Sequence, residues 1–271
     1  MSREDAYPWR FSLFLMTYYA ANSVYQGFIS VYFAGKGLDS AQIGVLMSAV
    51  PVVSLLTQPA WGALGDRARS RARVLRLLCV MAAGAILLLP VNDSFWYLAA
   101  VLSLFAASYP SIQPMGDSVI LEALQQRGQP FGKVRLLGTY AFALSSILFG
   151  KLINGHLDRM PWMTALALAA VFAATFWLPS AAGHAREKRG ASMMVLMKNG
   201  RLMRLIALTT LMQVTMGYFY VFFPVYFTAL PGGSPALLGW AFFLSASSET
   251  VFLLLGDRLF DRLGVGRLLL I

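Results

Sequence analysis

The sequence is poor in charge, and it has almost no cysteine or histidine. Charged residues make up 13% of the 271 positions, against about one quarter in a soluble domain. A single cysteine, Cys79, excludes a disulfide framework and a cysteine metal cluster. His156, with Asp158 beside it, and His184 offer no partner nucleophile for a membrane acyltransferase or protease. We therefore expect no enzyme, no cofactor and no metal site.

Long apolar runs take the place of these groups. Hydrophobic residues make up 58% of the chain, and the mean hydropathy is +0.64. About 20 apolar residues cross a bilayer as one helix, and the runs lack the alternation of a membrane β-barrel. The sequence thus predicts an all-α polytopic membrane protein with about eight transmembrane helices. The expected helices are Phe11–Ala34, Ala41–Leu64, Val74–Pro90, Phe95–Leu124, Val134–Ile153, Met160–Pro179, Leu202–Leu230 and Ala236–Leu259, and a ninth begins at Leu268.

Basic residues set the expected orientation in the membrane. The formal net charge of +10 comes from short connections between apolar runs, without the aromatic residues that accompany basic ones in nucleic-acid-binding surfaces. We therefore expect no nucleic acid partner. Most Lys and Arg lie on one side of the predicted membrane, and the other side keeps Lys36, Lys151 and Arg159. Because cytoplasmic loops carry the excess of Lys and Arg, the N-terminus is predicted to be cytoplasmic. The polar start, followed by a run too long for a signal-peptide core, predicts no cleavable signal peptide.

The longest polar connection divides the predicted helices into two groups. Residues 180–200 are expected to be a cytoplasmic linker between a six-helix N-terminal half, residues 1–179, and a partial C-terminal half, residues 201–271. The pattern Leu-x-Asp-Arg follows the second run at Leu64 to Arg67 and the eighth run at Leu259 to Arg262. An offset of six helices predicts a parallel repeat of two six-helix halves.

The first copy of this pattern carries a family resemblance. Its fuller form is Gly-x-Leu-x-Asp-Arg-x-x-x-Arg, formed by Gly62, Leu64, Asp66, Arg67 and Arg71. It resembles the loop between helices two and three in the major facilitator superfamily, although Arg69 replaces the later glycine of that loop. The resemblance implies a twelve-helix transporter, so the chain is expected to be truncated after the eighth helix. It also implies that this gating loop, with Asp261 and Arg262 of the second copy, clamps the two halves by charge pairing. A plain anchoring loop is the alternative.

Further elements narrow the resemblance. They are Gln58-Pro59, Pro114-x-x-Asp117, Phe131-Gly132-Lys133-x-Arg135-x-x-Gly138 and Ser248-Glu249. Together they resemble the lactose permease-like branch, and particularly its phenylpropionate permease type. The resemblance implies a monomeric, proton-coupled symporter of a small organic solute that works by alternating access in a bacterial-type inner membrane. An aromatic carboxylate is the expected solute. The alternatives are a sugar or nucleoside permease, and a non-transporting membrane scaffold or inactive transporter fragment.

Asp117 and Arg135 flank a predicted turn and can meet between two antiparallel helices. In the transporters that the chain resembles, the matching carboxylate and Arg contact the substrate. A guanidinium suits a carboxylate because it presents two parallel donors. The alternative is that Arg135 anchors the helix at the membrane surface and that Asp117 lies in interfacial water.

Polar and aromatic residues on the first predicted helix form a second candidate group. Tyr18, Asn22, Tyr25 and Gln26 recur at helical spacing. Such a stripe either lines a cavity or packs against neighbouring helices through hydrogen bonds. We expect Asn22, Tyr25 and Gln26 in the substrate site, with Phe142 as an aromatic residue that could stack on the solute.

Glu249 is the candidate for proton coupling. It lies near the middle of the eighth predicted helix, with no Lys or Arg within one turn. A charged carboxylate at that depth costs on the order of 3 kcal/mol on insertion scales. Because burial disfavours the ionised form, we expect Glu249 to load and release a proton as access alternates. A neutral Glu249 hydrogen-bonded to Ser245 or Ser248 is the structural alternative.

Overall fold

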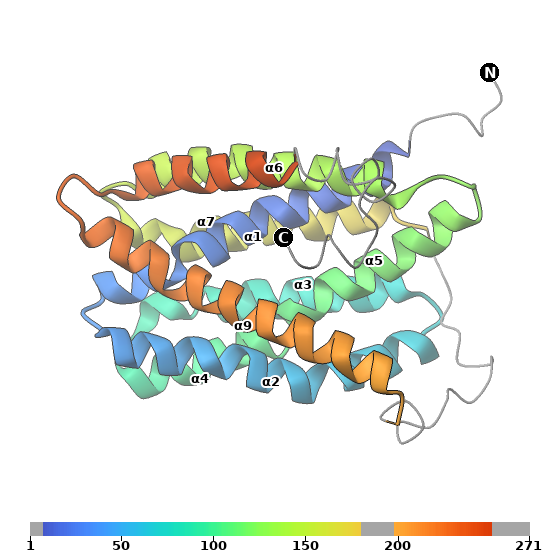
Figure 1. The fold of residues 1–271 in the computed structure, drawn as a ribbon, viewed down its shortest axis with the longest axis horizontal. Coiled ribbons are helices and arrows are strands. Elements are labelled where there is room, and N and C mark those ends of the chain that lie inside the picture. The colour runs from blue at the N-terminus through green and yellow to red at the C-terminus, as the bar shows by residue number, and fades with distance from the viewer. Residues whose placement is uncertain (1–7, 180–197, 251–271) are drawn as a thin grey trace.

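Long helices run side by side through most of the chain, in a computed structural model that describes residues 8–179 and 198–250 (Figure 1). The α-helices are α1 (Trp9–Gly35), α2 (Ser40–Arg67), α3 (Arg71–Ile86), α4 (Phe95–Ala106), α5 (Tyr109–Gln125), α6 (Phe131–Ile153), α7 (Met160–Ala174), α9 (Gly200–Ala229) and a last helix over residues 235–250. Short 3-10 turns are η1 (Leu89–Val91), η2 (Leu157–Arg159) and η3 (Thr175–Trp177). The linker expected at 180–200 lies largely outside the described residues, as do Asp261, Arg262 and the ninth run.

The helix positions confirm the all-α prediction within the described part of the chain. Among the described residues, six segments are long and apolar enough to cross a membrane: Ser40–Arg67, Arg71–Val91, Phe95–Gln125, Val134–Ile153, Leu157–Trp177 and Leu202–Ala229. Local chemistry sets some ends. Helix α2 begins with a capping box, because the Asp39 side chain accepts from the Gln42 N–H and the Gln42 side chain accepts from the Asp39 N–H.

The fourth expected helix is wrong as one continuous helix, because it divides into α4 and α5 at Ala107 and Ser108. Pro110 has no N–H and restricts the residue before it, so the ladder of helical hydrogen bonds cannot continue through this point. Trp61 of α2 donates its Nε1–H to the Ala107 carbonyl at 2.6 Å. The Ala107 carbonyl therefore keeps a hydrogen-bond partner although the helix is interrupted here.

Helix α1 lies at the centre of the bundle. It contacts α6, α7 and α9 and also touches α2 and α5. Large side chains along its length, such as Phe14, Phe28 and Phe33, are completely buried. Polar residues can therefore face the interior here without contacting lipid, as buried helices allow. From this central position α1 contributes side chains to more than one cavity.

The last helix, red in Figure 1, packs closely along α6. Ser146 of α6 donates its hydroxyl to the Gly239 carbonyl at 3.1 Å. A Cβ on Gly239 would collide with the Ser146 carbonyl and lie 3.2 Å from the Ile147 Cα. Glycine is thus required for the two backbones to approach, as at small-residue interfaces between membrane helices.

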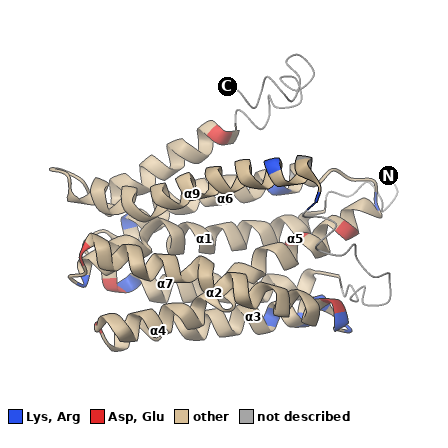
Figure 2. Ribbon diagram, turned by 60° about the horizontal axis from the view of Figure 1, so that its bottom comes forward, with Lys and Arg blue, Asp and Glu red and all other residues tan. Residues whose placement is uncertain are grey.

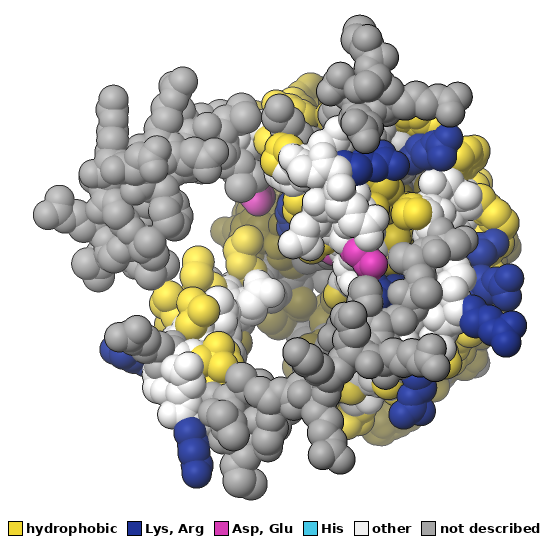
Figure 3. Space-filling model, turned by 90° about the vertical axis from the view of Figure 1, so that its right-hand side faces the viewer, with side chains coloured by type: hydrophobic (Ala, Val, Ile, Leu, Met, Phe, Trp, Pro, Cys, Tyr) yellow, Lys and Arg dark blue, Asp and Glu magenta, His cyan; other side chains and the backbone are white. Residues whose placement is uncertain are grey.

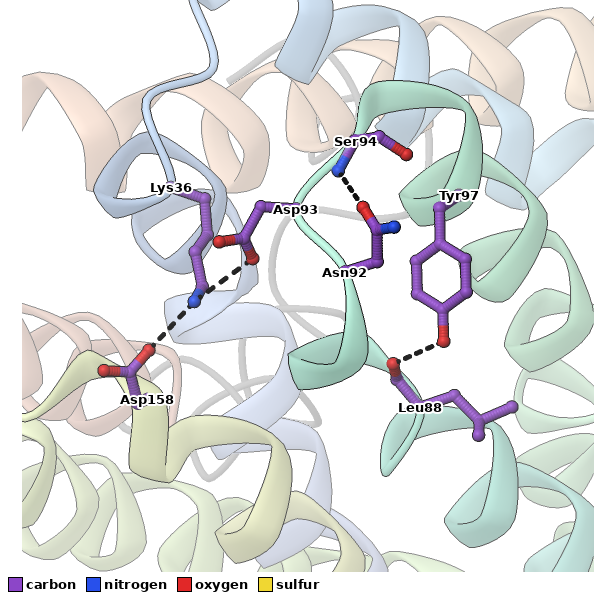
Figure 4. A network of polar contacts seen from close by, with 7 residues as sticks. All are labelled: Lys36, Leu88, Asn92, Asp93, Ser94, Tyr97 and Asp158. Atoms are coloured by element: carbon purple, nitrogen blue, oxygen red, sulfur yellow. Dashed lines mark hydrogen bonds and ion pairs between the residues drawn. The ribbon is translucent and has the colours of Figure 1, made fainter.

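Charged residues gather at the two ends of the helices (Figure 2). At one end, called here the arginine-rich end, Arg67, Arg69 and Arg73 are exposed where α2 passes to α3. At the opposite end, Lys36 Nζ lies 3.2 Å from Asp93 Oδ1 and 3.1 Å from Asp158 Oδ1 (Figure 4). Burial lowers the pKa of Lys36, but hydrogen bonds to Asp158 and Asp93 outweigh it and raise the pKa above its ordinary value.

Candidate functional site

A small pocket lies where four helices from distant parts of the chain meet. Its volume is about 90 Å³, and α1, α6, α9 and the helix over 235–250 all contribute to it. The lining residues are Tyr19, Asn22, Arg135, Thr139, Phe142, Tyr220, Phe242, Ser245, Ala246 and Glu249. Viewed from the arginine-rich end, the molecule is hollowed, with hydrophobic side chains along the hollow (Figure 3).

Helical spacing explains why these residues meet. Arg135, Thr139 and Phe142 follow one another at four and three residues on α6, so they share one face. Phe142 is buried and packs edge-to-face against Phe242, with ring centroids 6.4 Å apart. The predicted residues Asn22, Arg135, Phe142 and Glu249 are therefore brought together in one pocket.

Asp117 forms a long ion pair with Arg135. Its Oδ2 lies 3.8 Å from Arg135 Nη1, and its side chain is 20% exposed, against 44% for Arg135. Asp117 lines a separate cavity of about 560 Å³ that also contains Arg71 and Glu122. Its Oδ1 atom is buried without a hydrogen-bond partner. Asp117 thus lies outside the pocket and partly compensates the positive charge of Arg135, which lines it.

The expected polar stripe of α1 takes part both in packing contacts and in two cavities. Tyr18 and Tyr25 are buried and pack on aromatic residues, with Tyr18 stacked on Tyr109 at 6.0 Å and Tyr25 at 4.6 Å from Phe105. Tyr25 also borders a larger cavity between α1, α2 and α9, of about 1120 Å³. Tyr18 thus fits the packing alternative, whereas Tyr25 both packs on Phe105 and Tyr109 and lines a cavity.

Asn22 and Gln26 are joined by a hydrogen bond. Asn22 Nδ2 donates to Gln26 Oε1 at 3.0 Å, and the Tyr109 hydroxyl donates to Asn22 Oδ1 at 2.9 Å. Asn22 is thereby fixed at the pocket wall. Gln26 lines the neighbouring 1120 Å³ cavity instead, together with Gln213 and Gly217 of α9.

Glu249 differs from its expectation. Its side chain is exposed at the pocket rather than buried in the middle of a helix bundle. In the alternative, Ser245 or Ser248 would hydrogen-bond to Glu249, but the Ser248 hydroxyl donates to the Ser245 carbonyl at 2.7 Å. The carboxylate therefore lines the same pocket as Arg135 of α6.

The predicted gating loop is held to α5 through Arg71. Arg71 is 4% exposed, and its Nη1 donates to Glu122 Oε2 at 3.0 Å and to the Ser118 hydroxyl at 3.2 Å, both on α5. Gly62 and Asp66 line a cavity of about 250 Å³ beside Arg71. Arg67 is exposed. The clamp between two halves remains a prediction, because its second copy lies outside the described residues.

Several pocket residues were not predicted. They are Tyr19, Thr139, Phe242, Ser245 and Ala246. The spacing of Tyr19, Asn22 and Gln26 could have placed Tyr19 on the polar face of α1, since residues three and four apart share a helix face. The same spacing links Phe242, Ser245 and Glu249.

Comparison with known proteins agrees with this architecture. Residues 8–271 match the model of the MFS_1 like family. The chain is 29% identical over 270 residues to the maltose permease of Geobacillus stearothermophilus, covering 96% of the chain and 67% of that protein. It is 28% identical over 276 residues to an Escherichia coli (strain K12) protein named "Probable 3-phenylpropionic acid transporter", covering 94% and 68%.

A crystal structure of the nucleoside transporter NupG has the same fold. The TM-score is 0.76 at 17% identity, with 98% of this chain and 70% of that chain covered. The chain spans 57% to 68% of the length of the curated relatives it matches.

Proposed function

Because the chain belongs to the MFS_1 like family, we propose that it binds a small organic solute for secondary active transport by alternating access. The observation that carries this proposal is the placement of Arg135 and Glu249 in one pocket with aromatic rings. Placing an ionisable side chain among membrane-spanning helices costs free energy, and such residues commonly mark the path of a solute or an ion. The pocket also lies between helices that precede and follow the linker, where a relative movement of the two groups would open or close it.

The charges of the pocket favour a neutral, hydroxyl-bearing solute such as a sugar or nucleoside. Arg135 is compensated by Asp117 at 3.8 Å, and Glu249 lines the same pocket without belonging to that pair. Hydroxyl groups can donate to Glu249 and accept from Arg135, whereas a solute carboxylate would meet repulsion from Glu249. Tyr220 and Phe242, stacked on each other at 5.9 Å, offer an apolar wall for a ring.

An aromatic carboxylate is the second candidate, and one observation favours it. One atom pair joins Arg135 to Asp117, at 3.8 Å, and the Arg135 side chain is 44% exposed. Several N–H donors of the guanidinium therefore remain available for a solute carboxylate. The relative named for 3-phenylpropionic acid is consistent with such a solute.

Direct binding distinguishes these solutes. The 271-residue chain in detergent micelles would be titrated with maltose, uridine and 3-phenylpropionate in a calorimeter. We expect a neutral solute to bind and 3-phenylpropionate to bind more weakly at pH 7. The reverse order would favour the carboxylate. Binding of none of the three would contradict the proposed solute classes and favour the non-transporting scaffold.

The orientation follows the distribution of basic residues. We place the N-terminus and the arginine-rich end in the cytoplasm of a bacterial-type inner membrane, because that end holds most Lys and Arg. A reporter inserted in residues 180–197 should be cytoplasmic, and one inserted at Gly155 should be exported. The opposite pattern would reverse the orientation.

A further inference from the structure

Arg135 and Gly138 lie one turn apart on α6, and the ring of Tyr19 from α1 meets both. The Arg135 guanidinium carbon lies 5.6 Å from the centroid of the Tyr19 ring. A Cβ built on Gly138 would lie 2.5 Å from Tyr19 Cδ2 and 2.9 Å from Tyr19 Cε2. The ring therefore occupies the space that any other residue at position 138 would take.

Other contacts fix the ring in this place. The Tyr19 hydroxyl accepts a hydrogen bond from Gln113 Nε2 of α5 at 3.1 Å. Tyr18 packs edge-to-face against Tyr19, with centroids 5.6 Å apart. Helices α1, α5 and α6 thus all contribute to one orientation of the Tyr19 ring.

The position of Arg135 needs such support. Arg135 lies one turn from the start of α6, near the arginine-rich end. A long arginine side chain at that depth gains hydration by extending toward the aqueous phase. The contact with Asp117, at 3.8 Å, is long for a hydrogen bond and leaves Arg135 partly exposed. An aromatic face offers a guanidinium a second attraction within about 6 Å of the ring centroid.

We propose that Tyr19, whose ring packs against Gly138, is a positioning residue that holds the Arg135 guanidinium in the pocket. The proposal rests on the proposed function for its consequence, since it gives Tyr19 a role in solute binding through Arg135. It also gives a physical reason for glycine three residues after the arginine, because the Tyr19 ring fills the space that a side chain at position 138 would need. Replacement of Gly138 should therefore act on Arg135 without touching the pocket directly.

The orientation of Arg135 can be measured without any solute. In the 271-residue chain labelled with ¹⁵N-arginine, the ring current of Tyr19 should displace the side-chain Nε–H signal of Arg135, which Arg135→Lys would identify. Tyr19→Phe keeps the ring on Gly138 and should keep most of the displacement. Tyr19→Leu should abolish it, and Gly138→Ala should abolish or reduce it. Gly84→Ala is the control, because a Cβ on Gly84 meets nothing within 4 Å.

An Arg135 signal that is unchanged in Tyr19→Leu would overturn the proposal, whether or not any solute binds. A signal changed equally by Gly84→Ala would overturn it as well. If Gly138→Ala does not fold, the comparison of Tyr19→Phe with Tyr19→Leu decides the question alone. Failure of the proposed function would appear separately, as absence of solute binding to the parent chain.

The effect on binding has its own signature. With the solute that the parent binds best among maltose, uridine and 3-phenylpropionate, Tyr19→Leu should weaken binding about three- to thirtyfold, the range of one cation–π contact. In an Arg135→Ala background, Tyr19→Leu should cause no further loss, because its effect passes through Arg135. An equal loss in both backgrounds would mean that Tyr19 acts on the solute itself and would contradict the positioning role.

Discussion

Arg135 Nη1 lies 3.8 Å from Asp117 Oδ2, across the two helices that a short turn joins. The pair is a single loose contact, and the second oxygen of Asp117 is buried without a hydrogen-bond partner. Asp117 therefore compensates the charge of Arg135 without occupying its donors. The net charge that a solute meets in the pocket depends on this carboxylate.

Asp117→Asn should change which solutes bind. The amide keeps the shape of the side chain but removes its negative charge, so Arg135 would attract anions more strongly. We expect 3-phenylpropionate to gain affinity relative to maltose or uridine by about tenfold, the effect of about 1.4 kcal/mol. Calorimetric titration of the variant would measure it. Asp93→Asn, at the opposite end of the bundle, is the control, and an unchanged order of affinities in Asp117→Asn would contradict this role.

Glu249→Gln tests proton coupling. The carboxylate lines the pocket, and the predicted coupling needs a side chain that exchanges a proton there, which glutamine cannot do. Binding of the solute to the parent in weakly buffered solution should cause a measurable uptake or release of protons, which a pH indicator would record. The variant should bind solute with no such proton signal. Equal proton signals from parent and variant would exclude Glu249 as the coupling residue.

Gly239→Ala tests the contact between α6 and the last helix. The added Cβ would collide with the Ser146 carbonyl, and overpacking of this kind costs about 1–3 kcal/mol. We expect a lower melting temperature of the helical circular dichroism signal in detergent. The matched change Gly84→Ala adds the same methyl group in open space and should leave the chain as stable or slightly more stable. Equal melting of Gly239→Ala and the parent would contradict the close approach.

Lys36→Met tests the ion pairs at the opposite end. The pKa of Lys36 is raised above its ordinary value of 10.5, so protonated Lys36 stabilises the fold. That contribution is fully present below the unfolded pKa and is lost as pH rises through the higher folded pKa. Because Asp93 and Asp158 are exposed, the effect should be small, about 1–2 °C in melting temperature. The parent should melt higher than the variant at pH 8, and the difference should shrink above pH 11. A constant difference at both pH values would contradict it.

Local sequence predicted the helices well because a run of apolar residues has few other ways to lie in a membrane. Pro110 marks the break before Tyr109 in the sequence, but the length of the apolar run favours one continuous helix, and the break was not predicted. The contact of Trp61 with the Ala107 carbonyl depends on how α2 packs, which no local pattern contains.

The pocket could be predicted only in part. Arg135 and Glu249 stand out as charges in apolar runs, and both line the pocket. Tyr25 could not be separated from Asn22 by spacing alone, because the packing of the neighbouring helices decides which of these side chains reaches the pocket. The exposure of Glu249 likewise depends on the position of α1 and α6 relative to the last helix.

The most direct test of a solute pocket at Arg135 is calorimetric titration of Arg135→Ala and Arg127→Ala beside the parent chain. Arg127 is exposed beyond the end of α5 and contacts the ring of Phe11, so it serves as the matched loss of one arginine. Removal of charged hydrogen bonds from Arg135 should weaken binding of the best solute by about 10- to 150-fold. Arg127→Ala should bind as the parent does. Parent-like binding by Arg135→Ala, with the protein still folded, would contradict the account.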